Sequence, residues 1–165
     1  LRMALQVKKE LNKKNFKVYM TREDDRYTER IKIGKMANKS KAKLMVSIHR
    51  NKAEDKSAQG VEVFLPMDNN EESRYLGNQI MKQLHKEGFT KRRIRAGTLV
   101  SKEHEYDELS KNKMPSCLVE LGFISNKHDN RLFDNNLKGN AKAMAKAIEN
   151  TYSHYYEKDK NSDEK

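Results

Sequence analysis

The fold is decided by the stretch Met114-Pro115-Ser116-Cys117-Leu118-Val119-Glu120-Leu121-Gly122-Phe123-Ile124-Ser125-Asn126. Residues 116–121 form a short apolar run after a proline, which is typical of a buried strand. Glu120 lies near the end of this run. Buried strands of α/β sheets are mostly apolar, and ligand chemistry in such folds collects beyond their carboxyl ends. Glu120 is therefore a candidate functional residue, although a carboxylate here can also pair with an arginine or cap the next helix.

The residues after this strand predict a turn and a helix. Gly122 frees the backbone to turn, and Ser125 or Asn126 can cap a helix whose first turn holds Asp129. Cys117 is the single cysteine of the chain and lies inside the apolar run. We expect it to be a small buried hydrophobic residue.

The first 40 residues predict two helices around a strand. Apolar residues recur at helical spacing over residues 1–13, and residues 16–20 alternate as a strand that ends at Thr21 and Arg22. The acids at 23–25 predict the start of a helix through about Lys39. Its expected inner side carries Tyr27, Ile31, Gly34 and Ala37.

Alternation of helices and strands continues along the chain, which indicates an α/β fold. Residues 44–48 predict a second buried strand that delivers His49 at its carboxyl end, and a polar loop at 52–59 leads to a strand at 60–65. We expect further elements at 71–87 (helix closed by Gly88), 98–100 (short strand) and from about 137 to 155 (amphipathic helix).

Composition predicts one globular domain with a strongly basic surface. The 165 residues are 35% hydrophobic and 36% charged, and no apolar run reaches transmembrane length. We place the domain at 1–158 and a charged tail at 159–165. The net charge of +11 implies attraction to a polyanion: nucleic acid, an anionic membrane surface or an acidic cell-wall polymer. The dense basic cluster is confined to 91–95, so a solvated lysine-rich surface is favoured over a dedicated nucleic-acid face.

The segment 101–113 allows two interpretations. It contains His104, Glu105, Asp107 and Glu108, whose side chains are metal-ligand types. The segment has no apolar periodicity, however, and this favours a solvated surface loop over a metal cluster.

Four motifs in order resemble the zinc-dependent N-acetylmuramoyl-L-alanine amidases of bacterial autolysins, sporulation enzymes and phage endolysins. They are Thr21-Arg22-Glu23-Asp24-Asp25, Val46-Ser47-Ile48-His49-Arg50-Asn51, Gln59-Gly60-Val61-Glu62-Val63-Phe64 and the stretch from Met114 to Asn126. The resemblance implies a mixed, mostly parallel twisted sheet with helices on both faces. It also implies a zinc ion held by two histidines and a glutamate, and a further glutamate as catalytic base.

Position by position, the family's second zinc-binding histidine matches His49, and its catalytic glutamate matches Glu120. The other two ligands belong to a Gly-His-Gly-type strand end and a helix glutamate that the family places before the segment matched by Leu1. Neither is present in residues 1–165. We therefore expect that a first strand is missing from this sequence, and that the chain as written binds zinc poorly and is inactive.

The resemblance implies hydrolysis of the amide between N-acetylmuramic acid and L-alanine in peptidoglycan, at the cell wall or outside the cell. Anionic cell-wall polymers are a further expected partner. Two alternatives are a catalytically inactive wall-binding relative and a basic nucleic-acid-binding module. The second lacks helix-turn-helix, zinc-finger and RNA-recognition signatures, and its basic cluster has no interleaved aromatic residues. We expect Arg22 and Asp25 to form a structural pair and Asn51 to bond near the metal site.

Overall fold

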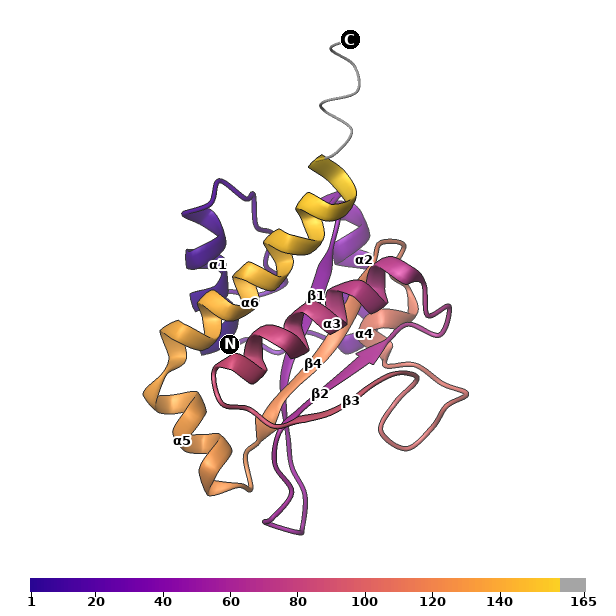
Figure 1. Ribbon diagram of the computed structural model, residues 1–165. Coiled ribbons are helices and arrows are strands. Elements are labelled where there is room, and N and C mark those ends of the chain that lie inside the picture. The colour runs from indigo at the N-terminus through magenta and orange to yellow at the C-terminus, as the bar shows by residue number, and fades with distance from the viewer. Residues whose placement is uncertain (158–165) are drawn as a thin grey trace.

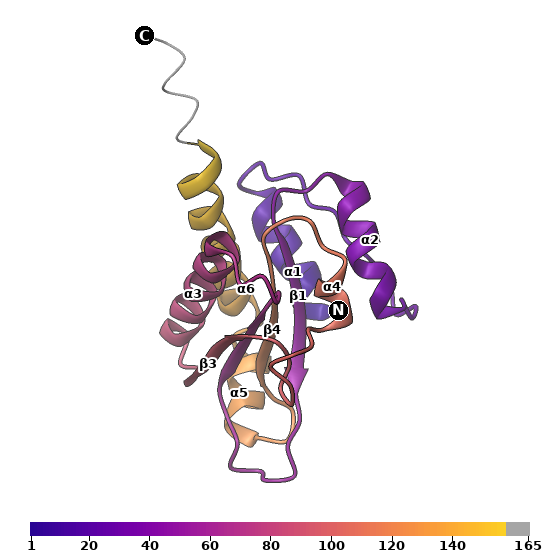
Figure 2. The same cartoon turned by 90° about the vertical axis from the view of Figure 1, so that its right-hand side faces the viewer.

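A computed structural model describes residues 1–157 as one mixed four-stranded sheet between two layers of helices (Figures 1 and 2). The strands lie in the order β1-β4-β2-β3; the pairs β1·β4 and β2·β3 are parallel, and β2·β4 is antiparallel. The predicted mixed, mostly parallel sheet is confirmed. The strands are β1 Met45–Asn51, β2 Val61–Leu65, β3 Lys91–Ala96 and β4 Ser116–Phe123. The helices are α1 Arg2–Asn12, α2 Arg30–Ser40, α3 Glu71–Lys86, α4 Asp107–Ser110, α5 Lys127–Asn135 and α6 Leu137–Tyr152, followed by a π-helical turn, η1 Ser153–Glu157. The expected tail at 159–165 lies outside the described residues.

The two faces of the sheet differ in chemistry because side chains alternate along each strand. One face packs on α1, α3 and α6 and forms the main core, with Val63 of β2 and Val119 of β4 completely buried. On the other face, α4 packs on β4, and α2 packs against α4 (Figure 2). A small apolar cluster of Phe64, Leu118 and Leu109 lies there, beside the polar residues of the candidate site. Within residues 1–157, no helix is long and apolar enough to cross a membrane.

The central prediction, a buried strand over residues 116–121, is confirmed and extends to Phe123. Cys117 is fully buried, and this burial raises the pKa of its thiol. Gly122 has φ +70°, a conformation that favours glycine. Asn126 caps α5 by accepting hydrogen bonds from the backbone N–H groups of His128 and Asp129.

The predicted strand at 16–20 is wrong. Among the described residues this segment pairs with no strand, although its apolar side chains pack against other parts of the protein. The Phe16 ring packs edge-on against Tyr152 at 5.2 Å, and Val18 packs against the core. The alternation of apolar and polar residues in this segment therefore reflects which side chains pack against the core, and it does not show that the segment is a strand of the sheet.

The helix predicted from the acids at 23–25 begins later, at Arg30. Asp24 accepts hydrogen bonds from the backbone and side chain of Arg26, so the acids stabilise a turn and not a helix start. Gly34 and Ala37 are buried as predicted, whereas Tyr27 lies outside the helix and is 82% exposed. Ile31 is also exposed, at 39%.

The strand predicted at 98–100 is also wrong. The sheet instead uses β3, which contains the basic cluster of residues 91–95. Charged side chains are compatible with this strand because it forms an edge of the sheet.

Candidate metal and catalytic site

Three neighbouring strands place ionisable side chains in one row across the sheet. His49 on β1 is the register partner of Glu120 on β4, and Glu120 is in turn opposite Glu62 on β2. Side chains directly opposite each other lie on the same face with their Cβ atoms about 5 Å apart. The structure thus brings together His49 and Glu120, the two site residues predicted from the sequence, and adds Glu62.

Glu120 is a carboxyl group with a perturbed pKa. Burial, followed by the nearby charges of Glu62 and Glu108, raises the pKa of Glu120 to about 7. Its Oε2 atom is buried and has no hydrogen-bond partner among residues 1–157. A carboxyl with a pKa near neutrality can both accept a proton and return it.

His49 lies in the same row with its side chain 40% exposed. Burial lowers the pKa of His49, more than the Glu108 carboxylate raises it, and the positive charge of Arg30 lowers it further. The imidazole is consequently neutral at neutral pH and keeps one nitrogen lone pair for a ligand. Its Nε2 atom lies 3.0 Å from the hydroxyl oxygen of Ser47, two residues earlier on the same strand.

Glu108 corrects the prediction of a solvated loop at 101–113. This side chain is only 1% exposed, on the one-turn helix α4, and its Oε1 lies 3.5 Å from Nε2 of His49. Its Oε2 is buried, and no described residue forms a hydrogen bond with it. His104 of the same segment is exposed, as a solvated loop predicts. The helix α4 has only four residues, which is too short to show helical periodicity in the sequence. The only sequence signal for the burial of Glu108 is the apolar residue next to it, Leu109.

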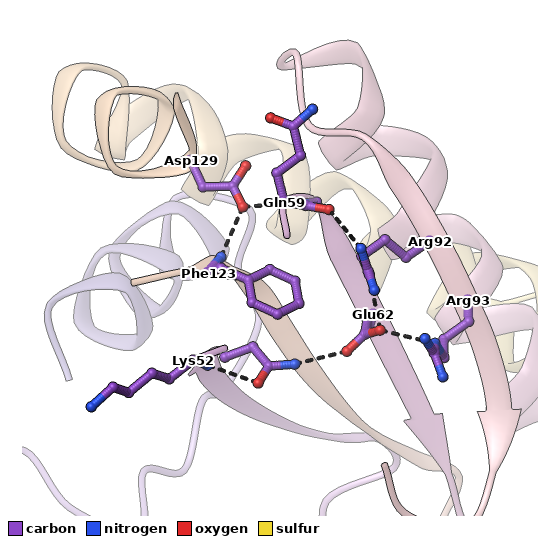
Figure 3. Close-up of polar contacts among 9 residues, drawn as sticks. Lys52, Gln59, Glu62, Arg92, Arg93, Phe123 and Asp129 are labelled. Carbon is purple, nitrogen blue, oxygen red and sulfur yellow. Dashed lines mark hydrogen bonds and ion pairs between the residues drawn. The ribbon is translucent and has the colours of Figure 1, made fainter. Parts of the chain in front are cut away.

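Glu62 is the second residue that sequence reasoning missed, and its environment differs from that of Glu120. Its fully buried carboxylate accepts hydrogen bonds from Nε of Arg92 (3.0 Å) and from Nδ2 of Asn51 (2.8 Å), and it forms an ion pair with Nε of Arg93 at 2.9 Å (Figure 3). Two guanidinium groups compensate its charge, so Glu62 holds the strands together as a carboxylate. An acid inside the apolar strand at 61–65, followed by an Arg-Arg pair on the next strand, was the available signal.

Asp129 fixes the end of the site strands. One of its oxygens accepts the backbone N–H groups of Gly60, which precedes β2, and of Phe123, the last residue of β4, both at 2.8 Å (Figure 3). Asn51, at the end of β1, accepts the N–H of Lys52 while it donates to Glu62. The ends of β1, β2 and β4 are thereby tied to one another.

Two predicted contacts outside this row can be placed. Arg22 and Asp25 form the expected pair, with Nη1 and Oδ1 3.4 Å apart. Asn51 donates a hydrogen bond to Glu62 of the row, and its predicted place beside a metal site stays a prediction.

The row has the chemistry of a partial metal site. The imidazole of His49 and a carboxylate oxygen of Glu108, 3.5 Å apart, are donors of the kind that bind a divalent cation such as zinc. Among residues 1–157, no group of three or more histidine, cysteine or acidic side chains converges as a complete ligand set. These residues therefore fit zinc as part of its ligand set.

Comparison with known proteins assigns the chain to a family. The sequence pattern of the N-acetylmuramoyl-L-alanine amidases matches residues 1–150. The chain belongs to this amidase family. It is 30% identical over 138 residues to the probable cell wall amidase LytH of Staphylococcus aureus, a match that covers 83% of this chain and 42% of LytH. The chain thus spans about two fifths of the length of these curated relatives.

Solved structures of amidases have the same fold. The catalytic domain of CwlV, an N-acetylmuramoyl-L-alanine amidase from Bacillus (Paenibacillus) polymyxa var. colistinus, is 28% identical with a TM-score of 0.74, over 94% of this chain and 81% of that domain. The CwlD amidase of Clostridioides difficile, solved in complex with the GerS lipoprotein, is 25% identical with a TM-score of 0.77, over 93% of this chain and 84% of CwlD.

Proposed function

We propose that the protein carrying this chain is a zinc-dependent N-acetylmuramoyl-L-alanine amidase, which hydrolyses the amide between the lactyl group of N-acetylmuramic acid and L-alanine in peptidoglycan. The observation that carries the proposal is the register of His49 and Glu120 on adjacent strands, in a chain whose residues 1–150 match the amidase family. We assign His49 as a metal ligand and Glu120 as the catalytic base. Residues 1–158 belong to the domain that performs the reaction and lack its N-terminal strand.

The reaction needs one proton to move twice, and the buried carboxyl of Glu120 is suited to both transfers. It accepts a proton from the water whose oxygen bonds to the lactyl carbonyl carbon. It then returns the proton to the nitrogen of L-alanine as the C–N bond breaks. The products are a lactyl carboxylic acid and a peptide with a free N-terminal amine.

The remaining residues of the row hold this geometry. When bound, zinc polarises the carbonyl and acidifies water. His49 would hold the metal with its neutral imidazole. Glu62, fixed by Arg92 and Arg93, keeps a negative charge beside Glu120 and so helps to retain a proton on that carboxyl.

Product analysis tests the proposed bond specificity. Purified peptidoglycan is incubated with residues 1–165, and with the same chain extended before Leu1 by a Gly-His-Gly-type strand end and a helix glutamate. We expect the extended chain to release new L-alanine N-termini, and the chain as written to release few, because a catalytic zinc usually has three protein ligands. New reducing sugar ends or new D-amino-acid N-termini in place of L-alanine N-termini would contradict the assignment.

The place of action is a second part of the proposal. LytH, the Staphylococcus relative, is described as a cell wall amidase, and we propose that this protein also acts at the cell wall, outside the cell. The net charge of +11 supports anionic wall polymers as a binding partner. Nucleic acid is disfavoured because Arg92 and Arg93, in the densest basic cluster, already bind Glu62.

Binding to walls is expected to weaken with salt. Exposed charges are screened over about 10 Å at 0.1 M ionic strength and about 3 Å at 1 M. Cosedimentation of the chain with purified walls should therefore fall severalfold between dilute buffer and 1 M NaCl. Walls stripped of anionic polymers are the matched control and should bind less in dilute buffer. Unchanged retention in 1 M NaCl, or a preference for DNA over walls, would contradict this expectation.

A further inference from the structure

The pairing of β1 with β4 is interrupted directly after the candidate site. His49 of β1 is the register partner of Glu120 of β4. The next pair joins Asn51 and Phe123, so two residues of β4 lie opposite one residue of β1. Such a β-bulge is rare between parallel strands, and bulges occur often beside active sites, where they direct a side chain. Gly122, within the bulge, has φ +70°. The bulge therefore determines how the strand that carries Glu120 ends.

Arg50 is the residue opposite the bulge, and its side chain binds the bulged backbone. Its Nε donates a hydrogen bond to the carbonyl oxygen of Leu121 at 3.1 Å, and its Nη2 donates to that of Phe123 at 3.3 Å. These two carbonyls lie on either side of Gly122, and Leu121 directly follows Glu120. Hydrogen bonds from a charged donor are stronger than those between neutral groups. One guanidinium group thus fixes the backbone immediately after the proposed base.

The guanidinium group is itself held by α5. Nη2 of Arg50 also donates to Oδ1 of Asn130 at 2.8 Å, and Cζ lies 4.4 Å from the centre of the Phe133 ring, within the range of a cation–π contact. Asp129 of the same helix accepts the backbone N–H of Phe123 at 2.8 Å (Figure 3). The last residue of β4 is therefore bound through its N–H by an acid and through its carbonyl by Arg50.

The proposed reaction makes this segment sensitive to small movements. The carboxyl of Glu120 must reach the water that is attacked on the metal side of the row, where His49 lies. A displacement of about 1 Å in such a group can lower the rate about a hundredfold. Oε2 of Glu120 has no hydrogen-bond partner among residues 1–157, so packing and the position of the backbone must orient this oxygen.

We propose that Arg50 is a positioning residue for hydrolysis: by binding the carbonyls of Leu121 and Phe123, it holds the carboxyl of Glu120 at the correct distance from the metal bound by His49. The inference rests on the proposed function and adds to it a residue that acts only through the backbone of β4. Arginine suits this role because Nε and Nη2 lie in one rigid plane, whereas lysine has a single nitrogen on a flexible stem.

The test compares Arg50→Gln with the wild type in the chain that carries the complete ligand set. We expect kcat to fall ten- to a hundredfold and KM to change by less than threefold, because the loss concerns the orientation of the base. Zinc content should stay stoichiometric, since His49 is retained. Arg50→Lys keeps a charged donor in reach of the carbonyls, and its kcat should lie between those of Arg50→Gln and the wild type.

Ile80→Val is the control for stability. Ile80 lies on α3 and is completely buried in the main core. Its shortening should lower Tm and leave kcat unchanged at temperatures well below Tm. An Arg50 with a merely structural role would behave in the same way, so a lower Tm with kcat within twofold of the wild type in Arg50→Gln would overturn the inference.

A second measurement does not depend on hydrolysis. The N–H of Ile124 donates to the carbonyl oxygen of Asn51 at 2.8 Å, just beyond the bulge. In the 165-residue chain, Arg50→Gln should speed hydrogen exchange of this amide at least tenfold, and exchange at Val119, in the middle of β4, should change less than threefold. Equal effects at both amides, or none at either, would contradict the inference.

The two proposals fail in different ways. If the wild-type chain with the complete ligand set releases no L-alanine N-termini from peptidoglycan, the proposed function is wrong, and the role of Arg50 in catalysis falls with it. If that chain is active and Arg50→Gln is equally active, only the role of Arg50 is wrong.

Discussion

Replacement of Glu120 by Gln is expected to lower amide hydrolysis by a factor of about one hundred or more, in the form of the chain that carries the complete ligand set. Glutamine has nearly the same shape as glutamate but cannot accept the proton from water. Zinc content should be retained, because our assignment gives Glu120 the role of base and not of ligand. The measurement is the initial rate of appearance of L-alanine N-termini, together with metal analysis of the purified variant.

The matched variant for this experiment is His49→Ala, which should lose both zinc and hydrolysis. The two variants then separate metal binding from proton transfer. Stability provides the control for folding: the metal-free free energy of unfolding of Glu120→Gln should stay equal or rise, because the buried Oε2 of Glu120 has no partner to lose. Near-normal hydrolysis by Glu120→Gln, or stoichiometric zinc in His49→Ala, would show that the roles are assigned wrongly.

Replacement of Glu62 by Ala is expected to lower the free energy of unfolding by about 3 kcal/mol, at the lower end of the range for breaking a buried ion pair. Two guanidinium groups and the Asn51 amide lose their common acceptor, and a cavity remains in the sheet. The loss is at the lower end because the side chains of Arg92 and Arg93 are 31% and 40% exposed and can rehydrate. Urea unfolding in metal-free buffer measures the change.

Glu54 provides the comparison for Glu62. It is exposed in the loop before β2, and Glu54→Ala should change the free energy of unfolding by no more than about 0.5 kcal/mol. If Glu62→Ala costs less than about 1 kcal/mol, its ion pairs do not stabilise the fold as the structure indicates.

The sequence predicted best the parts of the fold that depend on burial of long apolar runs. The strand containing Glu120 and the helix capped by Asn126 were both predicted, because apolar patterning and capping act within a few neighbouring residues. The segment 16–20 was predicted wrongly since a strand also needs a partner for its backbone, and the pattern of one segment carries no information on its partner.

The difference between local patterns and distant contacts also explains which residues of the candidate site were predicted. His49 and Glu120 follow recognisable strands and match the motifs of a family, whereas Glu62 and Glu108 acquire their roles only through contacts distant in sequence. The Arg92 partner of Glu62 is 30 residues away along the chain. The position of Glu108 depends on how α4 covers the sheet (Figure 2), and a charged four-residue helix has no periodicity by which this could be predicted.

The strand order β1-β4-β2-β3 has a consequence for how the protein forms during synthesis. The central strand β4 is the last of the four to leave the ribosome, and it must insert between β1 and β2. Until then, the backbone groups at the facing edges of β1 and β2 are unpaired. Contacts between such distant segments form slowly and expose aggregation-prone surface. The nascent chain therefore carries His49 and Glu62 long before Glu120 joins them. Chaperone dependence should be greatest in this interval.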